Sequence, residues 1–231
     1  MKAIRNLILV LGDQLDLESS LIKEVDPNSD LIWMAEVEEE SVHVWSHKQK
    51  IVLFLSAMRH FRAALLKQGL PLIYTELEEG AESFAVSLKN TLKEYKPETV
   101  LVLRPGSWRV LKAIQSVCEK ASVKLKVSED DHFFTTPDEF KAFAENRKAI
   151  RMEYFYRGLR KQYNVLMEEE EPTGGVWNLD KENRKAFSKS GPDGPYHGHQ
   201  HKADAITLDV ITLVKKIFPN HPGSIDSFHW A

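Results

Sequence analysis

Cysteine is nearly absent from this sequence: Cys118 is the single one among 231 residues. One cysteine closes no disulfide within the chain, and it falls short of the four thiolates that hold an iron–sulfur cluster. Cys118 stands among residues with helical spacing, which favours a buried structural thiol over a reactive one. These residues alone therefore exclude a disulfide framework and a four-cysteine cluster.

Long apolar runs and an excess of one charge are lacking too. No apolar segment approaches the roughly 20 residues that cross a bilayer, and the first residues lack the apolar core of a signal peptide. The formal net charge is −3, so no overall basic field attracts nucleic acid, and DNA contact needs a local patch. With 42% hydrophobic residues, the sequence predicts a soluble, cytoplasmic protein with a buried core and no membrane contact.

What the sequence has is a regular alternation of strand and helix patterns. Apolar runs of strand length occupy residues 6–11, 30–37, 70–75, 99–103 and 124–127, and helical patterns occupy residues 47–68, 81–95 and 108–121. A continuously apolar strand is typical of a parallel sheet covered on both faces. The alternation therefore predicts an α/β fold with a doubly wound, five-stranded parallel sheet.

The pattern changes near residue 136. Thr136 and Pro137 begin a segment with acidic residues in its first turn, an arrangement typical of a helix N-terminus. The spacing predicts a helix from there to Met167, with a break near Asn146.

The remainder of the chain predicts a connector and one more helix. Residues 168–203 hold glycines, prolines and charges without periodicity, and residues 204–217 have a helical pattern that begins at Asp204. We therefore expect an α/β domain over residues 1–135, and a helical segment with an interdomain connector over residues 136–231.

Polar residues follow the first two strands. Gly12, Asp13 and Gln14 come after the first strand, and acidic residues up to Glu40 come after the second. Carboxyl ends of parallel strands meet at one edge of the sheet, where open α/β sheets bind ligands. A carboxylate there accepts hydrogen bonds from a ring N–H or a hydroxyl of a ligand, and Glu40 is the best placed. A plain tight turn and a solvated acidic loop are the alternatives, and both stay open.

Histidines form two further groups. His43 and His47 are four residues apart, and three more histidines lie between residues 197 and 201. Neither group has a nearby cysteine or a His-Glu-x-x-His helix. We therefore expect no metal site, and no nucleophile–base pair marks a catalytic residue.

Residues 147–161 are the most basic segment, with aromatic residues between the charges. Two interpretations stay open: the segment binds phosphates, or it is a solvated helix with ion pairs among Arg151, Glu153 and Arg157. The loop from Trp177 to Arg184 likewise either contacts another domain or nucleic acid, or is a connector held by burial of Trp177.

Several longer motifs resemble those of one known family. They are Leu9–Leu15, His47–Ile51, Phe54–Phe61, Glu145–Lys148, Met152–Arg157 and Gly174–Arg184, followed in order by Asp204–Thr207 and Phe218–His221. Together they resemble the bacterial photolyase-related proteins, the iron–sulfur branch of the photolyase–cryptochrome family. The resemblance runs nearly from one end of the chain to the other.

The resemblance implies a flavodoxin-like or Rossmann-like domain that holds an antenna chromophore, in this branch typically 6,7-dimethyl-8-ribityllumazine. It implies light-dependent repair of (6-4) photoproducts in DNA, or blue-light sensing. The antenna site that it implies comprises Gly12, Asp13, Gln14, Ala35, Val37, Glu40 and His43. His43 is a departure, because relatives often carry an aromatic residue there. The resemblance also places Arg184 in a connector near DNA.

In this family, FAD and a [4Fe-4S] cluster belong to a larger helical domain that follows the connector. That domain is absent from these 231 residues, so we expect a C-terminal FAD domain as the partner and no DNA repair by this chain alone. The rival interpretation is a stand-alone α/β module that binds a nucleotide or a protein without photochemistry. Binding of ribityllumazine or of ATP distinguishes the two.

Overall fold

The computed structural model describes residues 4–178, 180, 185–191 and 201–226. By their internal contacts these fall into two units, one formed by residues 1–132 with 200–231 and the other by residues 133–199.

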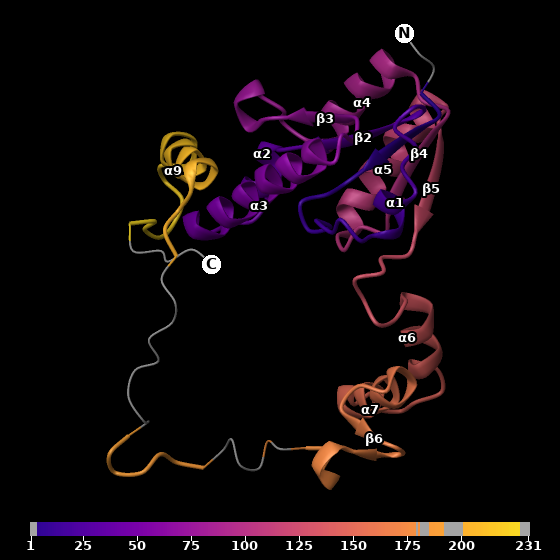
Figure 1. Ribbon diagram of the computed structural model, residues 1–231, viewed down its shortest axis with the longest axis vertical. Helices are drawn as coiled ribbons and strands as arrows, with labels where there is room; N and C mark the ends of the chain where they lie inside the picture. Colours follow the sequence, from indigo (N-terminus) through magenta and orange to yellow (C-terminus); the bar gives the residue numbers. More distant parts are fainter. Residues whose placement is uncertain (1–3, 179, 181–184, 192–200, 227–231) are drawn as a thin grey trace. The chain divides into compact units, whose positions relative to one another are not determined.

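A parallel sheet forms the centre of the first unit. Its strands are β1 (Asn6–Leu9), β2 (Asp30–Ala35), β3 (Leu72–Thr75), β4 (Thr99–Leu103) and β5 (Lys124–Ser128), in the order β3-β2-β1-β4-β5 (Figure 1). Every neighbouring pair is parallel, which confirms the predicted five-stranded sheet. The order reverses between β1 and β4, and this is where open sheets of this kind bind ligands.

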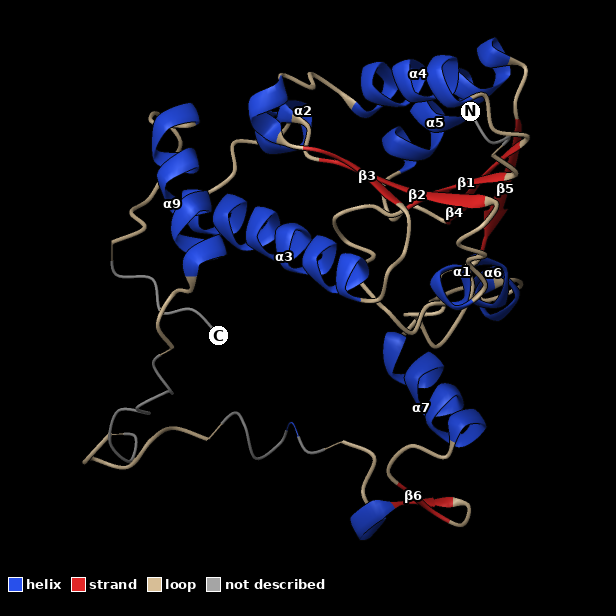
Figure 2. Ribbon diagram, turned by 45° about the horizontal axis from the view of Figure 1, so that its top comes forward, coloured by secondary structure: helices blue, strands red, loops and turns tan. Residues whose placement is uncertain are grey.

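Helices cover both faces of the sheet (Figure 2). They are α1 (Ser20–Lys23), α3 (Lys48–Lys67), α4 (Phe84–Tyr95) and α5 (Trp108–Ala121). Side chains of a strand alternate between the two faces. Leu7 and Leu9 accordingly pack with α4 and α5, whereas Ile8 packs with α1 and α3. The continuous apolar runs of the sequence therefore reflect two separate hydrophobic layers.

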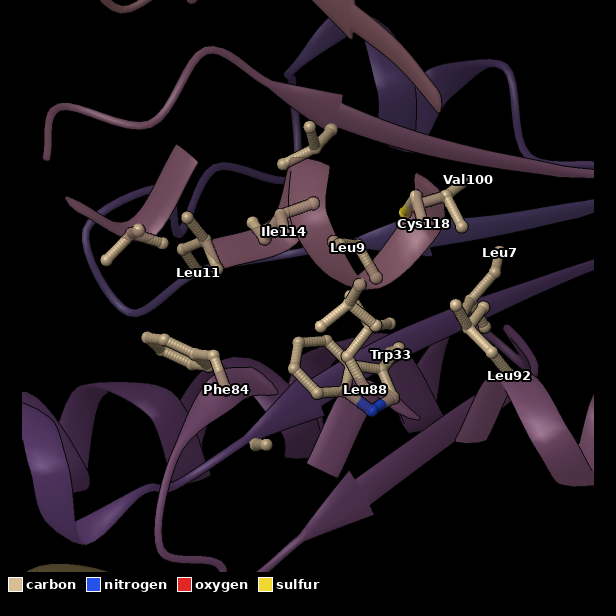
Figure 3. Packing of buried hydrophobic residues seen from close by; sticks show 14 of the residues in the cluster. Leu7, Leu9, Leu11, Trp33, Phe84, Leu88, Leu92, Val100, Ile114 and Cys118 are labelled. Carbon is tan, nitrogen blue, oxygen red and sulfur yellow. The ribbon is translucent and has the colours of Figure 1, made fainter. Parts of the chain in front are cut away.

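The layer under α4 and α5 is built around Trp33 of β2 (Figure 3). Its side chain is fully buried, and its indole N–H donates to the hydroxyl of Thr91 at 3.1 Å. The Phe84 ring lies 6.1 Å from the Trp33 ring between centroids. The indole therefore buries its apolar body while its polar atom keeps a partner.

Two short helices lie near the sheet edge. Helix α1 follows Ser19, which makes no side-chain capping hydrogen bond. The acidic residues after β2 are not a loop, because residues Glu38–Val42 form helix α2. Acids in the first turn of α2 suit the partial positive charge of a helix N-terminus.

Residues 200–231 belong to the first unit through α9 (Ala205–Ile217). This helix begins at Asp204, whose carboxylate accepts from the backbone N–H of Thr207 at 2.9 Å, as its sequence predicted. Val210 and Val214 of α9 are wholly buried in a cluster with Val52 of α3. This third layer lies beyond the sheet and packs on the outer side of α3.

The second unit contains α6 (Pro137–Ala144), α7 (Met152–Tyr163), the two-stranded β6 (Met167–Glu168) and β7 (Glu171–Pro172), and η2 (Thr173–Gly175). Thr136 and Glu139 form a reciprocal cap at the start of α6, which confirms the predicted helix start. The helical region is broken after Ala144 as expected, and it ends at Tyr163 rather than at Met167. Asn164, next in the chain, has a left-handed backbone (φ 52°) that ends a helix.

No helix in the described part of the chain is both long enough and apolar enough to cross a membrane.

Candidate functional site

A pocket of about 270 Å³ opens at the carboxyl edge of the sheet in the first unit. Its walls come from the turn after β1, the end of β2 with α2, the loop after β4, and one side of α3. The lining residues are Leu11, Gly12, Asp13, Ala35, Glu36, Val37, Glu40, Ser41, Ser46, Lys50, Ile51, Phe54, Leu55, Met58, Phe84, Pro105, Ser107 and Val110. The pocket therefore lies at the reversal point of the strand order, where the sequence predicted a ligand site.

The wall from α3 is mostly apolar, with Lys50 as the one charged residue that it contributes to the described lining. Ile51, Phe54, Leu55 and Met58 recur at helical spacing and turn one stripe of α3 toward the pocket. Gly12 allows the turn after β1 to come close to this stripe, because a Cβ at Gly12 would lie 3.0 Å from the Met58 sulfur. The apolar walls suit a flat, uncharged ring.

Five of the seven residues predicted for the antenna site are brought together in this pocket. They are Gly12, Asp13, Ala35, Val37 and Glu40. Gly12 and Asp13 arrive from the turn after β1, Ala35 ends β2, and Glu40 lies on α2.

Gln14 and His43 do not line the pocket. Gln14 is buried, and its amide donates to the carbonyls of Leu103 and Arg104 at 3.2 Å each. It therefore ties the turn after β1 to the end of β4. His43 is exposed at the end of α2. The predicted nucleic-acid residue Arg184 lies outside the described residues.

The histidines form no metal centre in the described part of the chain, where no group of three or more candidate ligands is found. His43 and His47 do not share a helix: His43 ends α2, and His47 caps α3 by accepting from the N–H of Gln49 at 3.1 Å. His197 and His199 lie outside the described residues.

The acids after β2 differ sharply in their surroundings. Glu36 has a fully buried side chain and is held by Arg59. Glu39 and Glu40 both pair with Arg109 of α5, Glu39 at 2.8 Å. Arg109 holds Glu40 through Oε1 only. A carboxylate has acceptor positions on both oxygens, and no partner of Oε2 is found in the described part of the chain, so Glu40 offers Oε2 to a ligand.

Asp13 is a second acceptor at the pocket. Its Oδ2 borders the loop after β4, 3.5 Å from where a Cβ on Gly106 would lie. Desolvation raises the pKa of the Asp13 carboxyl, the charges of Asp130 and Glu40 raise it further, and a hydrogen bond from its own backbone lowers it. No ion pair to Asp13 is found among the residues that the structure describes. Its carboxyl is therefore available to a ligand N–H or O–H group.

In the second unit, much of the basic charge of α7 has partners within the unit. Arg157 pairs with Glu153, which confirms that part of the solvated-helix interpretation. Arg160 is buried and donates to the carbonyls of Val165 and Leu166. Arg157 and Arg160 each lie 5.2 Å from the Trp177 ring centroid. Trp177 is thus held against α7 by cation–π contacts.

Glu36, Arg109 and Phe84 are among the residues of this site that sequence reasoning missed. The period of two along β2 offered a signal for Glu36, because it places this residue on the same face as Met34, toward α3. Arg109 and Phe84 reach the site from α5 and from the start of α4. No motif of the sequence linked these two residues to the acids after β2.

Comparison with known proteins agrees with the geometry. The sequence profile of the deoxyribodipyrimidine photo-lyase-related proteins matches residues 8–230. A (6-4) photolyase of Agrobacterium fabrum is 36% identical over 228 residues, which cover 97% of this chain and 44% of that protein. An uncharacterized protein of Acanthamoeba polyphaga mimivirus is 21% identical over 195 residues, which cover 80% of this chain and 96% of that protein.

This chain thus spans less than half the length of the Agrobacterium protein, although nearly all of its own length matches. The family match includes both the residues of the pocket and those of the second unit. The chain belongs to the deoxyribodipyrimidine photo-lyase-related protein family.

Proposed function

We propose that the pocket at the carboxyl edge of the sheet binds an antenna chromophore, 6,7-dimethyl-8-ribityllumazine. The protein would serve light-dependent repair of (6-4) photoproducts in DNA, or blue-light sensing. One observation carries the proposal: in a chain of this family, an apolar-walled pocket lies at the reversal point with two carboxylates, Asp13 and Glu40, at its polar side.

The chemistry of the pocket suits this pigment. Phe54, Met58 and Phe84 supply apolar contact for a flat bicyclic ring. The pigment carries a ring N–H and ribityl hydroxyls, and carboxylates accept hydrogen bonds from such donors. A volume of about 270 Å³ is close to the lower end of the range for small-molecule pockets, which limits the ligand to one small heterocycle. When bound, the pigment would supply absorption of near-ultraviolet and blue light.

The carboxylates and Arg109 favour an uncharged ligand over a phosphorylated one, and Lys50 is the only cationic side chain among the described residues that line the pocket. Glu40 is kept in place by Arg109, which also binds Glu39. Because Arg109 already pairs with two carboxylates, it has no positive charge left over for a phosphate. Asp13 adds a further carboxylate that would repel an anion.

The flavin and the iron–sulfur cluster would belong to a further domain, and that domain would be the partner of this chain. The lone thiol of Cys118 is buried, and desolvation raises its pKa to about 11, so it is poorly suited to bind a metal as a thiolate. We infer that pigment binding in the cytoplasm, rather than repair, is the task of these 231 residues. A contact with DNA would come from the connector near Arg184.

Titration of the purified protein tests the proposal. We expect 6,7-dimethyl-8-ribityllumazine to bind with micromolar or tighter affinity, on the order of −8 kcal/mol, with shifted absorption and quenched fluorescence. ATP serves as the competing ligand. Tight binding of ATP without binding of the pigment would instead favour the stand-alone nucleotide module.

A further inference from the structure

Glu36 is a buried carboxylate that borders the pocket and binds only protein groups. Glu36 follows directly after β2, and its side chain has no exposed surface. Its Oε1 accepts from Arg59 Nε at 2.7 Å and from the Tyr74 hydroxyl at 2.6 Å. Its Oε2 accepts from Arg59 Nη2 at 2.8 Å and from the backbone N–H of Leu77 at 2.9 Å.

These contacts leave the Glu36 carboxylate saturated. Each oxygen already accepts two hydrogen bonds, and a carboxylate offers about four acceptor positions in all. Burial and the charge of Glu36 raise the pKa of the Tyr74 hydroxyl, which therefore keeps its proton and donates it. Glu36 thus has no capacity left for a ligand, although it borders the pocket.

The partners of Glu36 come from three different elements. Arg59 lies on α3, next to the pocket residue Met58, while Tyr74 lies on β3 and Leu77 begins η1 (Leu77–Glu79). Arg59 also donates to Glu78 of η1 at 2.9 Å. The carboxylate therefore fastens the end of β2 to α3, and both elements contribute residues to the walls of the pocket.

We propose that Glu36 is a positioning residue, which sets the distance between the end of β2 and α3 and so fits the pocket to a flat ring. This inference rests on the proposed pigment site, and it gives Glu36 a role beyond stability. Substitution would change the shape of the pocket as well as the stability of the fold, because Arg59 would lose its buried partner and keep only the partly exposed Glu78.

Glu36→Gln is the direct test. The amide group places an N–H donor where Arg59 or Leu77 also presents a donor, so the four-bond arrangement is lost. We expect the affinity for 6,7-dimethyl-8-ribityllumazine to fall about tenfold or more, with a changed absorption maximum of the pigment that still binds. We also expect faster amide hydrogen exchange at residues 35–42, because this segment includes several residues that line the pocket.

Asp30→Asn is the matched control. Asp30 lies at the other end of β2, with a side chain 1% exposed. It accepts from Arg5 Nε at 3.0 Å, from Arg5 Nη2 at 2.7 Å and from the Asn6 amide at 2.9 Å. Asp30→Asn should lower the melting temperature about as much as Glu36→Gln does. Pigment affinity should stay within about twofold, and exchange at residues 35–42 should be unchanged.

Two results would overturn the positioning role. One is an equal loss of pigment affinity in Glu36→Gln and Asp30→Asn, and the other is unchanged exchange at residues 35–42 in Glu36→Gln. If Glu36→Gln does not fold, Tyr74→Phe removes a single hydroxyl from the same carboxylate and should shift affinity and exchange in the same direction. If the unaltered protein binds no pigment, the proposed function fails, and the exchange comparison still decides the role of Glu36.

Discussion

His60 of α3 and Asp204, the cap of α9, are joined at 2.7 Å between Nε2 and Oδ2. The other ring nitrogen of His60 lies 2.7 Å from the backbone carbonyl of Ser56. Both nitrogens face acceptors, and only the protonated imidazole donates from both. The contact therefore holds α9 against α3 through a charged histidine.

The stability of this contact should depend on pH. The pKa of His60 is raised, chiefly by its hydrogen bond to Asp204 and also by the hydrogen bond to the Ser56 carbonyl. Desolvation acts in the opposite direction and lowers this pKa. The pKa of Asp204 is lowered to about 2, chiefly by the Thr207 N–H and then by His60. The histidine contribution is complete below about pH 6.5 and is lost as pH rises through the raised pKa. The aspartate contribution is present above about pH 4 and is lost on acidification toward pH 2.

We therefore predict that the melting temperature of the first unit falls between pH 6.5 and pH 9, and that His60→Asn removes most of this fall. His43→Asn, which alters an exposed histidine outside the α3–α9 contact, should leave it in place. Thermal unfolding followed by circular dichroism over this pH range measures the effect. The same pH profile in His60→Asn and in the unaltered protein would refute the charged contact.

Gly12→Ala should weaken pigment binding by several-fold. Its Cβ would lie 3.0 Å from the Met58 sulfur, so Met58 has to shift within the pocket wall. Gly158→Ala is the control, because no atom lies within 4 Å of that Cβ on α7 and alanine favours a helix by about 1 kcal/mol over glycine. Calorimetric titration of both variants gives the comparison, and equal affinities would argue against close packing of the turn on α3.

Trp177→Leu should loosen the second unit. The indole is contacted by Arg157, Arg160 and Lys161, and each cation–π contact contributes about 0.5–1 kcal/mol. Limited proteolysis should then cleave residues 165–178 faster. Trp108→Leu, an exposed tryptophan of the first unit, should leave that cleavage unchanged. Unaltered cleavage in Trp177→Leu would show that the cation–π contacts of the Trp177 ring do not stabilise the second unit.

Cys118 should resist thiol reagents in the folded protein. Its side chain is buried, and desolvation raises its pKa to about 11, so little thiolate forms at pH 8. We expect a colorimetric thiol reagent to react only as fast as the domain opens, and rapidly after denaturation. Fast reaction under native conditions would contradict the packing of Cys118 against the sheet.

The sheet could be predicted from the sequence because its signals are local. The apolar run of β4 and the helical stripe of α5 matched the structure to the residue. The reciprocal cap at Thr136 is likewise a short-range motif. The position of the pocket at the carboxyl edge of the sheet followed from a general rule of α/β folds, whereas the strand order was not predicted.

The chemistry of the acids was harder to predict because it depends on distant partners. Glu36 and Glu40 are four residues apart, yet one is saturated by Arg59 and Tyr74 while the other retains a free oxygen. Arg59 is 23 positions from Glu36 along the chain. Such pairing is set by tertiary packing rather than by local pattern.

The packing of α9 on α3 was missed for the same reason. Val210 and Val214 form an apolar stripe whose partner, Val52, lies more than 150 positions away in the sequence. An apolar stripe indicates that a helix packs on another element, but it does not identify that element.

Glu40 and Glu39 offer the most direct test of the pigment site. They are neighbours on α2, both bind Arg109, and of the two only Glu40 lines the pocket. Parallel titrations of Glu40→Ala and Glu39→Ala with 6,7-dimethyl-8-ribityllumazine separate ligand contact from the shared ion pair. We predict a loss of about tenfold or more for Glu40→Ala, as for a hydrogen bond to a charged group, and little change for Glu39→Ala. Unchanged affinity in Glu40→Ala, or equal losses in both variants, would contradict the proposed site.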